Sequence, residues 1–122
     1  MRFSNDRPIF AQIAELLEDE VVAGRLKAGE RLPSARDLAA SLEVNPNTAA
    51  RALQILADQG VALAERGTGY YVAAEAAAKA SAVRRERFFG ETLPAVFKAM
   101  DELGIGMDEL ATRYGARVKA GG

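Results

Sequence analysis

The chain has 122 residues and a formal net charge of −1, with 16 Lys and Arg against 17 Asp and Glu. It contains no cysteine and no histidine, which excludes a Cys/His zinc site, a thiol nucleophile, an imidazole base and a disulfide framework. No metal and no cofactor is therefore predicted, and the length suits one small domain or a small domain with an appendage.

Membrane and targeting signals are also absent from the sequence. No stretch approaches the length of a membrane span, and no signal peptide is visible at the start. We therefore expect a cytoplasmic protein with no membrane partner. The net charge close to zero argues against a protein that coats nucleic acid without regard to sequence. A local basic face can still suffice for specific binding.

The first part of the chain predicts a packing helix. Residues 1–7 have the character of a mobile lead-in. Apolar side chains then recur at helical spacing over residues 8–23, and Gly24 ends this amphipathic segment. The connector of residues 26–33 contains a glycine turn, and one of its residues is expected to add a short strand to a neighbouring sheet.

Two short helices separated by a tight break follow in residues 33–60. Ser34 is a good N-cap for the first, with Asp37 three residues later completing a capping box. Pro46 stops this helix, because the residue before a proline is disfavoured in the α region. The second helix begins at the same proline, capped by Asn45, and Gly60 is placed as its C-terminal stop. The segment therefore predicts a helix-turn-helix.

The outward face of the second helix suggests a function. Asn47, Thr48 and Arg51 fall in its first turn and a half, where a recognition helix presents side chains to base edges and phosphates. All three side chains can donate hydrogen bonds. The alternative is that Asn45 and Thr48 only cap the helix and Arg51 is only a solvated charge, since helix-turn-helix pairs also occur in proteins that never meet DNA.

A β-hairpin is expected over residues 61–72, where the apolar period changes from helical to alternating. After a helix-turn-helix, such a hairpin is a wing that can lie along the DNA backbone or minor groove. Arg66 would supply charge, and Gly67 with Gly69 would let the main chain approach phosphate closely. The alternative is a plain tight hairpin, in which the glycines are present only because the turn requires residues with positive φ angles.

At this point the sequence resembles a known family. The motifs Ala28-Gly29-Glu30-Arg31-Leu32-Pro33-Ser34, Val44-Asn45-Pro46-Asn47-Thr48 and Arg66-Gly67-Thr68-Gly69-Tyr70-Tyr71-Val72 occur in the order and spacing of the winged helix-turn-helix domain of GntR-type bacterial transcription regulators. The resemblance covers roughly the first three-fifths of the chain. It implies a dimeric repressor that contacts DNA through Arg36, the start of the second helix and the wing glycine Gly67.

The candidate DNA-binding residues are Ser34, Arg36, Asn45, Asn47, Thr48, Arg51, Arg66, Gly67 and Thr68. One position departs from the pattern of the family. Many members carry a basic residue directly before the position of Arg51, whereas this chain has Ala50. Part of the base recognition is therefore expected to differ.

From Ala73 onward the composition changes to strong helix formers. We expect a helical tail with a bend or restart near Gly90 and Pro94, and a last short helix that opens at Met107. A small set of helices cannot easily bury this many large apolar groups alone, so we expect a second copy of the chain to cover them. The predicted dimerisation residues are Phe88, Phe89, Leu93, Val96, Phe97, Met100 and Leu103.

These interpretations combine into one hypothesis. The fold class is mainly α with a small β-hairpin wing, divided into a winged helix-turn-helix domain over residues 1–73 and a helical dimerisation tail over residues 74–122. A tail this short resembles the YtrA-like branch of the family. The predicted function is sequence-specific binding of double-stranded DNA by a homodimeric repressor.

Three alternatives stay open. The chain can be a winged-helix module that binds other proteins through its tail, or a regulator gated by an unknown small-molecule effector between tail helices, with Arg84 or Arg87 binding an anion. An enzyme is the weakest of the three, because carboxylate pairs such as Glu15 and Asp19 lie on a helix surface with no nucleophile or metal-ligand cluster nearby.

Overall fold

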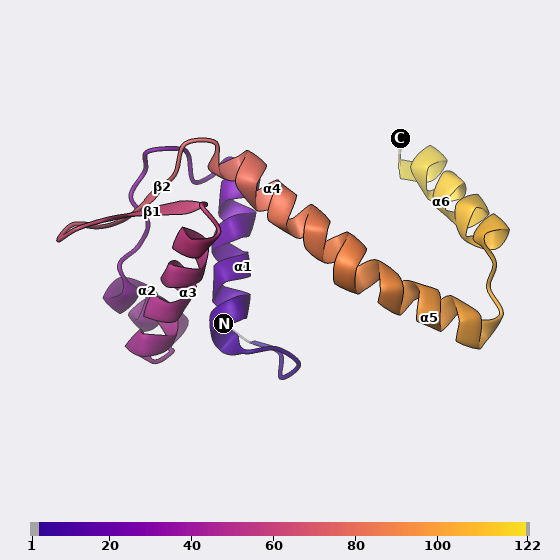
Figure 1. Ribbon diagram of the computed structural model, residues 1–122, viewed down its shortest axis with the longest axis horizontal. Coiled ribbons are helices and arrows are strands. Elements are labelled where there is room, and N and C mark those ends of the chain that lie inside the picture. Colours follow the sequence, from indigo (N-terminus) through magenta and orange to yellow (C-terminus); the bar gives the residue numbers. More distant parts are fainter. Residues whose placement is uncertain (1–2, 122) are drawn as a thin grey trace. The chain divides into compact units, whose positions relative to one another are not determined.

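The computed structural model describes residues 3–121. It contains α1 (Ile9–Val22), α2 (Ala35–Leu42), α3 (Pro46–Asp58), β1 (Ala62–Glu65), β2 (Gly69–Val72), α4 (Ala76–Arg87), the π-helical turn η1 (Phe88–Thr92), α5 (Leu93–Leu103) and α6 (Met107–Gly121). The fold is therefore mainly α with one hairpin, as predicted (Figure 1). Within residues 3–121, no helix combines the length and hydropathy needed to cross a membrane.

The N-terminal helices form a compact core around α3. This helix lies between α1 and α2 and contacts both (Figure 1). Ile13 of α1 packs with Leu53 and Leu56 of α3 in one cluster, and each of these side chains is at most 1% exposed. Burying such a side chain contributes about 2 kcal/mol to the free energy of folding, so the core fixes how α3 is presented.

Local side-chain caps set where α2 and α3 begin. The backbone N–H of Asp37 donates to Ser34 Oγ at 3.1 Å, and the N–H of Asn47 donates to Asn45 Oδ1 at 2.8 Å. α2 ends at Glu43, which adopts a left-handed conformation with φ of 57°. Both N-caps are confirmed, but the return bond from the Ser34 N–H to the Asp37 carboxylate, which would complete the predicted capping box, does not occur in the part of the chain that the structure describes. The tight break between the helices follows from the left-handed Glu43 and the Asn45 cap.

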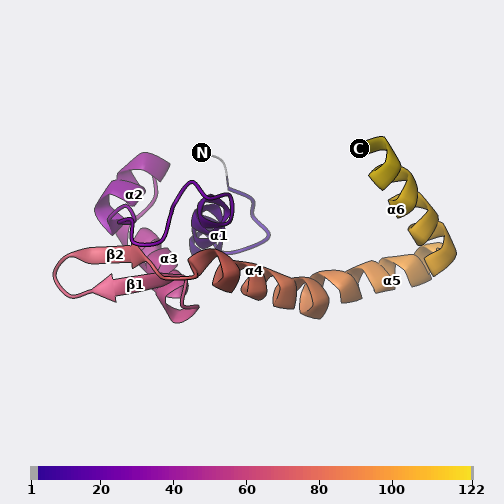
Figure 2. The same ribbon diagram turned by 90° about the horizontal axis from the view of Figure 1, so that it is seen from above.

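A two-stranded antiparallel sheet forms the wing. β1 pairs with β2 in a register that sets Glu65 opposite Gly69, which leaves a three-residue loop of residues 66–68. The expected extra strand residue is Arg31, which forms an isolated antiparallel bridge with Tyr71. Figures 1 and 2 show the hairpin projecting past the helices on the side where α2 and α3 lie.

The lead-in to α1 is held more firmly than its composition indicates. The buried side chain of Gln12 accepts a hydrogen bond from the Ser4 N–H and donates to the carbonyl oxygens of Ser4 and Arg7, each at 2.9 Å. Arg7 also forms an ion pair with Glu15, whose carboxylate raises the pKa of the guanidinium. The expectation of a mobile lead-in is therefore wrong for residues 4–7, and it lies outside the described residues for 1 and 2.

The described residues divide into two compact units, the first ending at Arg84 and the second beginning at Arg85. The predicted boundary between residues 73 and 74 coincides with the end of the wing. Ala76 and Ala80 of α4 are buried in the core of the first unit, so the start of this helix packs with the winged domain. The functional division at residue 73 stays a prediction.

A π-helical turn lies at the place where the sequence predicts a bend or a restart of the tail helix. η1 spans Phe88–Thr92 and contains Gly90, and α5 begins directly after it with Pro94 at one of its first two positions. Proline has no N–H to donate into the preceding turn, so one helical hydrogen bond is missing where the π turn meets α5. The last helix opens at Met107, as the sequence indicates, but the expectation of a short helix is wrong, because α6 continues for 15 residues to Gly121.

Candidate nucleic-acid interface

The exposed side of α3 carries the candidate recognition residues. Ala49, Ala52, Leu53 and Leu56 are buried on one side of this helix. Asn47 and Arg51 are exposed and project from the opposite side, four residues and therefore about one turn apart. Thr48 is half-buried at the flank. The structure thus brings Asn47 and Arg51 onto one solvent-facing stripe.

The two capping residues keep part of their hydrogen-bonding capacity. The Asn45 side-chain oxygen and the Ser34 hydroxyl oxygen accept bonds from their own helices, so these acceptors are committed to the fold. The Asn45 amide nitrogen and the Ser34 hydroxyl hydrogen can still donate outward. Each residue can therefore cap its helix and also donate to a phosphate, and the capping role does not exclude a binding role.

The wing positions its candidate residues through backbone geometry. Gly67 has a φ of +80° and would meet no atom within 4 Å if it carried a Cβ, so the loop tip is open. Thr68 donates from its N–H and its hydroxyl to the carbonyl oxygen of Glu65, at 3.0 and 3.3 Å. Thr68 therefore shapes the turn, while Arg66 is exposed at the tip.

The charges around the interface are arranged unevenly. The acidic residues of α1 are matched by arginines: Glu15 pairs with Arg7, Glu20 with Arg25, and Glu18 and Asp19 with Arg84. By contrast, Arg36, Arg51 and Arg66 form no ion pair within the residues that the structure describes. The cations on α2, α3 and the wing therefore keep their charges available, although each of these elements also carries one acidic residue, Asp37, Asp58 and Glu65 respectively.

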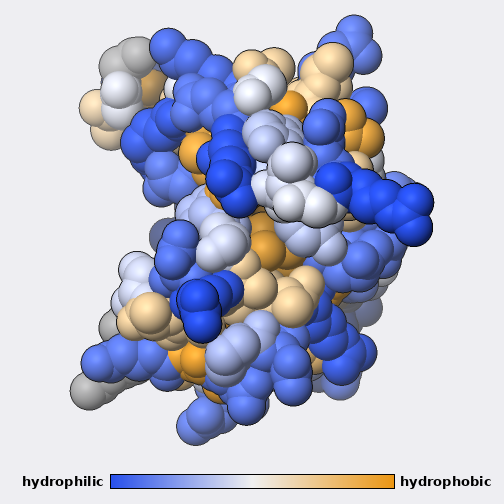
Figure 3. Space-filling model, turned by 90° about the vertical axis from the view of Figure 1, so that its left-hand side faces the viewer, coloured by the Kyte–Doolittle hydropathy of each residue, from blue (hydrophilic) through white to orange (hydrophobic). Residues whose placement is uncertain are grey.

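Figure 3 shows the side of the molecule on which the wing and α2 lie. Strongly hydrophilic side chains project from it, with apolar groups set between them. Such a surface suits contact with a polar partner better than burial against an apolar one.

Sequence reasoning missed a link between the wing and α3. The Tyr70 hydroxyl of β2 donates to Gln54 Oε1 at 3.3 Å, and Gln54 Nε2 donates to Asp58 Oδ1 at 2.9 Å. Gln54 follows Arg51 by three residues and lies on the same exposed stripe. The helical spacing could have placed Gln54 there, but its contact with the wing could not have been found from the sequence.

Two further contacts involve arginines of the interface. The Arg51 guanidinium carbon lies 4.0 Å from the centroid of the Phe10 ring on α1. Arg31 lies against the wing, because a Cβ built on Gly69 would come within 3.3 Å of Arg31 Nη2. Both contacts join segments that are distant in sequence, and no local motif signals them.

Comparison with known proteins identifies the family. The family model described as bacterial regulatory proteins, gntR family, matches residues 10–72 of the chain. The chain belongs to the GntR family. It is therefore a DNA-binding transcriptional regulator with a winged-helix fold.

Individual relatives extend this similarity beyond the winged domain. The HTH-type regulator YhcF of Bacillus subtilis is 31% identical over 109 residues, which cover 89% of this chain and 88% of YhcF. The HTH-type transcriptional repressor YtrA of the same organism is 36% identical over 69 residues, covering 57% of this chain and 53% of YtrA. A crystal structure of a GntR-family regulator from Bacteroides thetaiotaomicron aligns with a TM-score of 0.80 at 31% identity, over 93% of this chain and 99% of that one.

The tail of this GntR-family regulator exposes much of the predicted dimerisation set. Phe88, Phe89, Phe97 and Leu103 are all exposed, whereas Leu93 and Val96 are half-buried and Met100 is buried at 9%. Met100 is therefore already covered within one chain. The tail also exposes Met107, Tyr114 and Val118 on α6, which sequence reasoning did not select although their spacing of seven and four residues marks one helix face.

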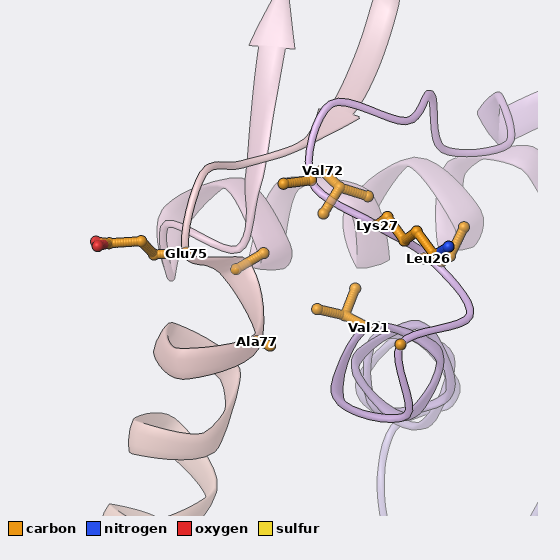
Figure 4. Close-up of a pocket in the computed structure, with 9 residues that line it drawn as sticks. Val21, Leu26, Lys27, Val72, Glu75 and Ala77 are labelled. Atoms are coloured by element: carbon orange, nitrogen blue, oxygen red, sulfur yellow. The ribbon is translucent and has the colours of Figure 1, made fainter.

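A cavity of about 240 Å³ lies at the root of α4 rather than between tail helices. The end of α1, the following loop, the end of β2 and the first turn of α4 line it, with Val21, Leu26 and Val72 as apolar walls (Figure 4). Lys27 and Glu75 also contribute to its lining. Sites for drug-sized ligands usually exceed about 300 Å³, so its size gives no particular support to an effector.

Proposed function

We propose that this GntR-family regulator is a homodimeric repressor that binds a pseudo-palindromic operator. The observation that carries the proposal is the set of arginines on α2, α3 and the wing that have no carboxylate partner among residues 3–121. Three cations without an acidic partner, presented from three successive elements, are available to contact a polyanion such as the DNA backbone.

Each predicted residue has a role in this proposal. Asn47 and Arg51 contact base edges in the major groove from the exposed side of α3. Thr48, Arg36, Ser34 and Asn45 donate to phosphates or bases beside it. Arg66, Gly67 and Thr68 bring the wing against the backbone or the minor groove. The hydroxyl of Thr68 acts mainly by holding the turn, because it already donates to Glu65.

The dimer is proposed from the exposed aromatic groups of the tail. A phenylalanine such as Phe97, with 47% of its surface exposed, is costly to leave in water when a second copy could cover it. A twofold dimer would place two α3 helices in successive major grooves, about 34–36 Å apart. The repressor activity named for the relative YtrA supports repression over activation.

The decisive experiment is a DNA-binding titration with a charge-matched control. Wild type, Arg51→Ala and Arg25→Ala are titrated by fluorescence anisotropy against a duplex enriched by the wild type from a random pool, and against a scrambled duplex. Arg25 pairs with Glu20 near the end of α1, so its removal changes net charge equally but outside the interface. We expect Arg51→Ala to lose about tenfold or more on the enriched duplex alone.

The result that contradicts the proposal is equally clear. Equal weak binding of all three proteins to both duplexes would mean that the wing and α3 do not recognise DNA sequence. The alternative of a protein-interaction module would then be favoured. In that case a variant of the tail such as Phe97→Ala should abolish binding to the partner protein, while Arg51→Ala should leave it intact. A repressor additionally requires that transcription from the bound site fall in a reconstituted assay.

A further inference from the structure

The contact between Phe10 and Arg51 joins the start of α1 to the recognition stripe of α3. At 4.0 Å from the ring centroid, the guanidinium carbon sits on the ring face, since ring hydrogens would hold an edge approach further away. Phe10 is half-buried and packs against the core cluster, whereas Arg51 is exposed. A fixed aromatic surface therefore supports a solvent-exposed cation.

We propose that Phe10 is a positioning residue that orients the Arg51 guanidinium for base recognition. This inference rests on the DNA contact proposed above for Arg51. No hydrogen bond or ion pair engages this guanidinium within residues 3–121, so the Phe10 ring is what restricts it.

The geometry suits recognition because stacking uses only a face of the guanidinium. The five N–H donors of arginine lie in the plane at the rim of the group, and a ring on one face leaves them free. Those donors form the bidentate pair with O6 and N7 of guanine. Phe10 thus restricts the rotamers of Arg51 without occupying the atoms that would contact a base.

Preorganisation explains why the contact should strengthen binding. An arginine free on a helix surface loses rotamer entropy when it docks against a base, and this loss weakens the complex. If Phe10 has already ordered the side chain, less entropy remains to be lost in the complex. Since the preceding residue is Ala50 and α3 has no other Lys or Arg, the orientation of this single guanidinium determines where the helix presents its positive charge.

The test compares Phe10→Leu, Phe10→Tyr, Arg51→Ala and the double variant Phe10→Leu/Arg51→Ala as full chains. Leucine keeps an apolar side chain in the core but removes the aromatic face, and tyrosine keeps the face. The probes are the duplex enriched from a random pool and its scrambled counterpart, each titrated across a salt series. Thermal unfolding of every variant reports whether the packing of α1 has changed.

The proposal predicts a specific pattern of losses. Phe10→Leu should weaken binding to the enriched duplex about threefold to tenfold, while Phe10→Tyr retains wild-type affinity. Binding to the scrambled duplex and the salt dependence should not change, because the number of cations is the same. The double variant should bind no more weakly than Arg51→Ala, because Phe10 acts through Arg51.

Failure of this inference can be told from failure of the proposed function. If Arg51→Ala weakens specific binding but Phe10→Leu has no effect, or an effect that adds fully in the double variant, positioning by Phe10 is wrong and the proposed function stands. If Arg51→Ala has no effect, the base contact itself is wrong, and the role of Phe10 falls with it.

A second measurement keeps the inference testable if Phe10→Leu unfolds. In the NMR spectrum of the free wild-type protein, the side-chain protons of Arg51 should show the upfield shift that an aromatic face causes. Their appearance at ordinary positions would mean that the two side chains do not stack in solution and would overturn the proposal.

Discussion

Arg84 Nη2 on α4 lies 2.5 Å from Asp19 Oδ1 on α1, which ties the first turns of the tail helix to the winged domain. The same nitrogen donates to the carbonyl oxygen of Glu15 at 3.1 Å, and Nε lies 3.9 Å from the carboxylate of Glu18. Since the Glu18 side chain is only 1% exposed, this guanidinium offsets a charge that water cannot reach.

Removing this guanidinium should destabilise the winged domain. We predict that Arg84→Met lowers the free energy of unfolding by about 2 kcal/mol, because the carboxylates of α1 lose their cation and Glu18 stays buried. Urea unfolding at neutral pH measures the change. Arg25→Met is the control: it breaks an Arg–Glu pair whose side chains are 64% and 41% exposed, and it should cost less than about 1 kcal/mol. Equal losses in the two variants would contradict a special role for Arg84.

The start of α3 allows capping to be separated from DNA contact. Asn45→Ala removes the acceptor of the Asn47 N–H and should lower the free energy of unfolding by about 1 kcal/mol. Asn47→Ala keeps that acceptor and loses only an exposed side chain, so its stability should stay within about 0.5 kcal/mol of wild type. Its specific DNA affinity should nevertheless fall, by about 1–3 kcal/mol if the side chain contacts a base. Paired unfolding and anisotropy measurements would contradict the assignment if Asn47→Ala lost stability but no affinity.

The wing glycines allow backbone strain to be separated from close approach. Gly67 and Gly69 have φ values of +80° and +119°, and only at Gly69 would a new Cβ meet another group, the Arg31 guanidinium. Gly67→Asn should leave stability nearly unchanged, because asparagine tolerates this conformation. It should still weaken DNA binding if the loop backbone lies against phosphate. Gly69→Ala should destabilise the hairpin by about 1–2 kcal/mol. Unchanged DNA affinity of Gly67→Asn would indicate that the wing does not approach DNA closely.

The features found from sequence are those encoded over a few residues. Ser34 and Asn45 cap their helices through bonds to residues two or three positions away, so the residue types at those spacings suffice to predict them. The positive φ of Gly67 follows in the same way from a local turn over residues 65–68, closed by the Thr68 N–H and the Glu65 carbonyl oxygen, because a β-turn that needs positive φ at its third residue favours glycine there. The recognition face of α3 needs only helical periodicity, which is why Asn47 and Arg51 were placed on the exposed side.

The features that were missed depend on how the elements pack. Arg84 and Asp19 are 65 residues apart, and Tyr70 and Gln54 are 16 apart, so neither pair leaves a local pattern. The lead-in was misjudged for a related reason. Polar residues 4–7 have the composition of a flexible end, and their order comes from one buried side chain, Gln12, on the following helix.

The exposed aromatic groups of the tail lead to the last prediction. Phe97→Asp adds a charge to the face proposed to pair with a second copy, and burying that charge would cost several kcal/mol. The dimer dissociation constant should rise about 100-fold or more, as sedimentation velocity over a concentration series would show. Ala99→Asp is the matched control. It adds the same charge to an exposed residue of α5, about 200° around the helix from Phe97, and should leave the dimer intact.

A monomeric Phe97→Asp protein should also lose much of its affinity for a pseudo-palindromic duplex but keep its affinity for a single half-site. Two linked recognition helices bind as one unit, and this advantage disappears when the link is broken. If Phe97→Asp and Ala99→Asp stayed equally dimeric, α5 would not form the interface. The exposed face of α6, with Tyr114 and Val118, would then be the surface to alter next.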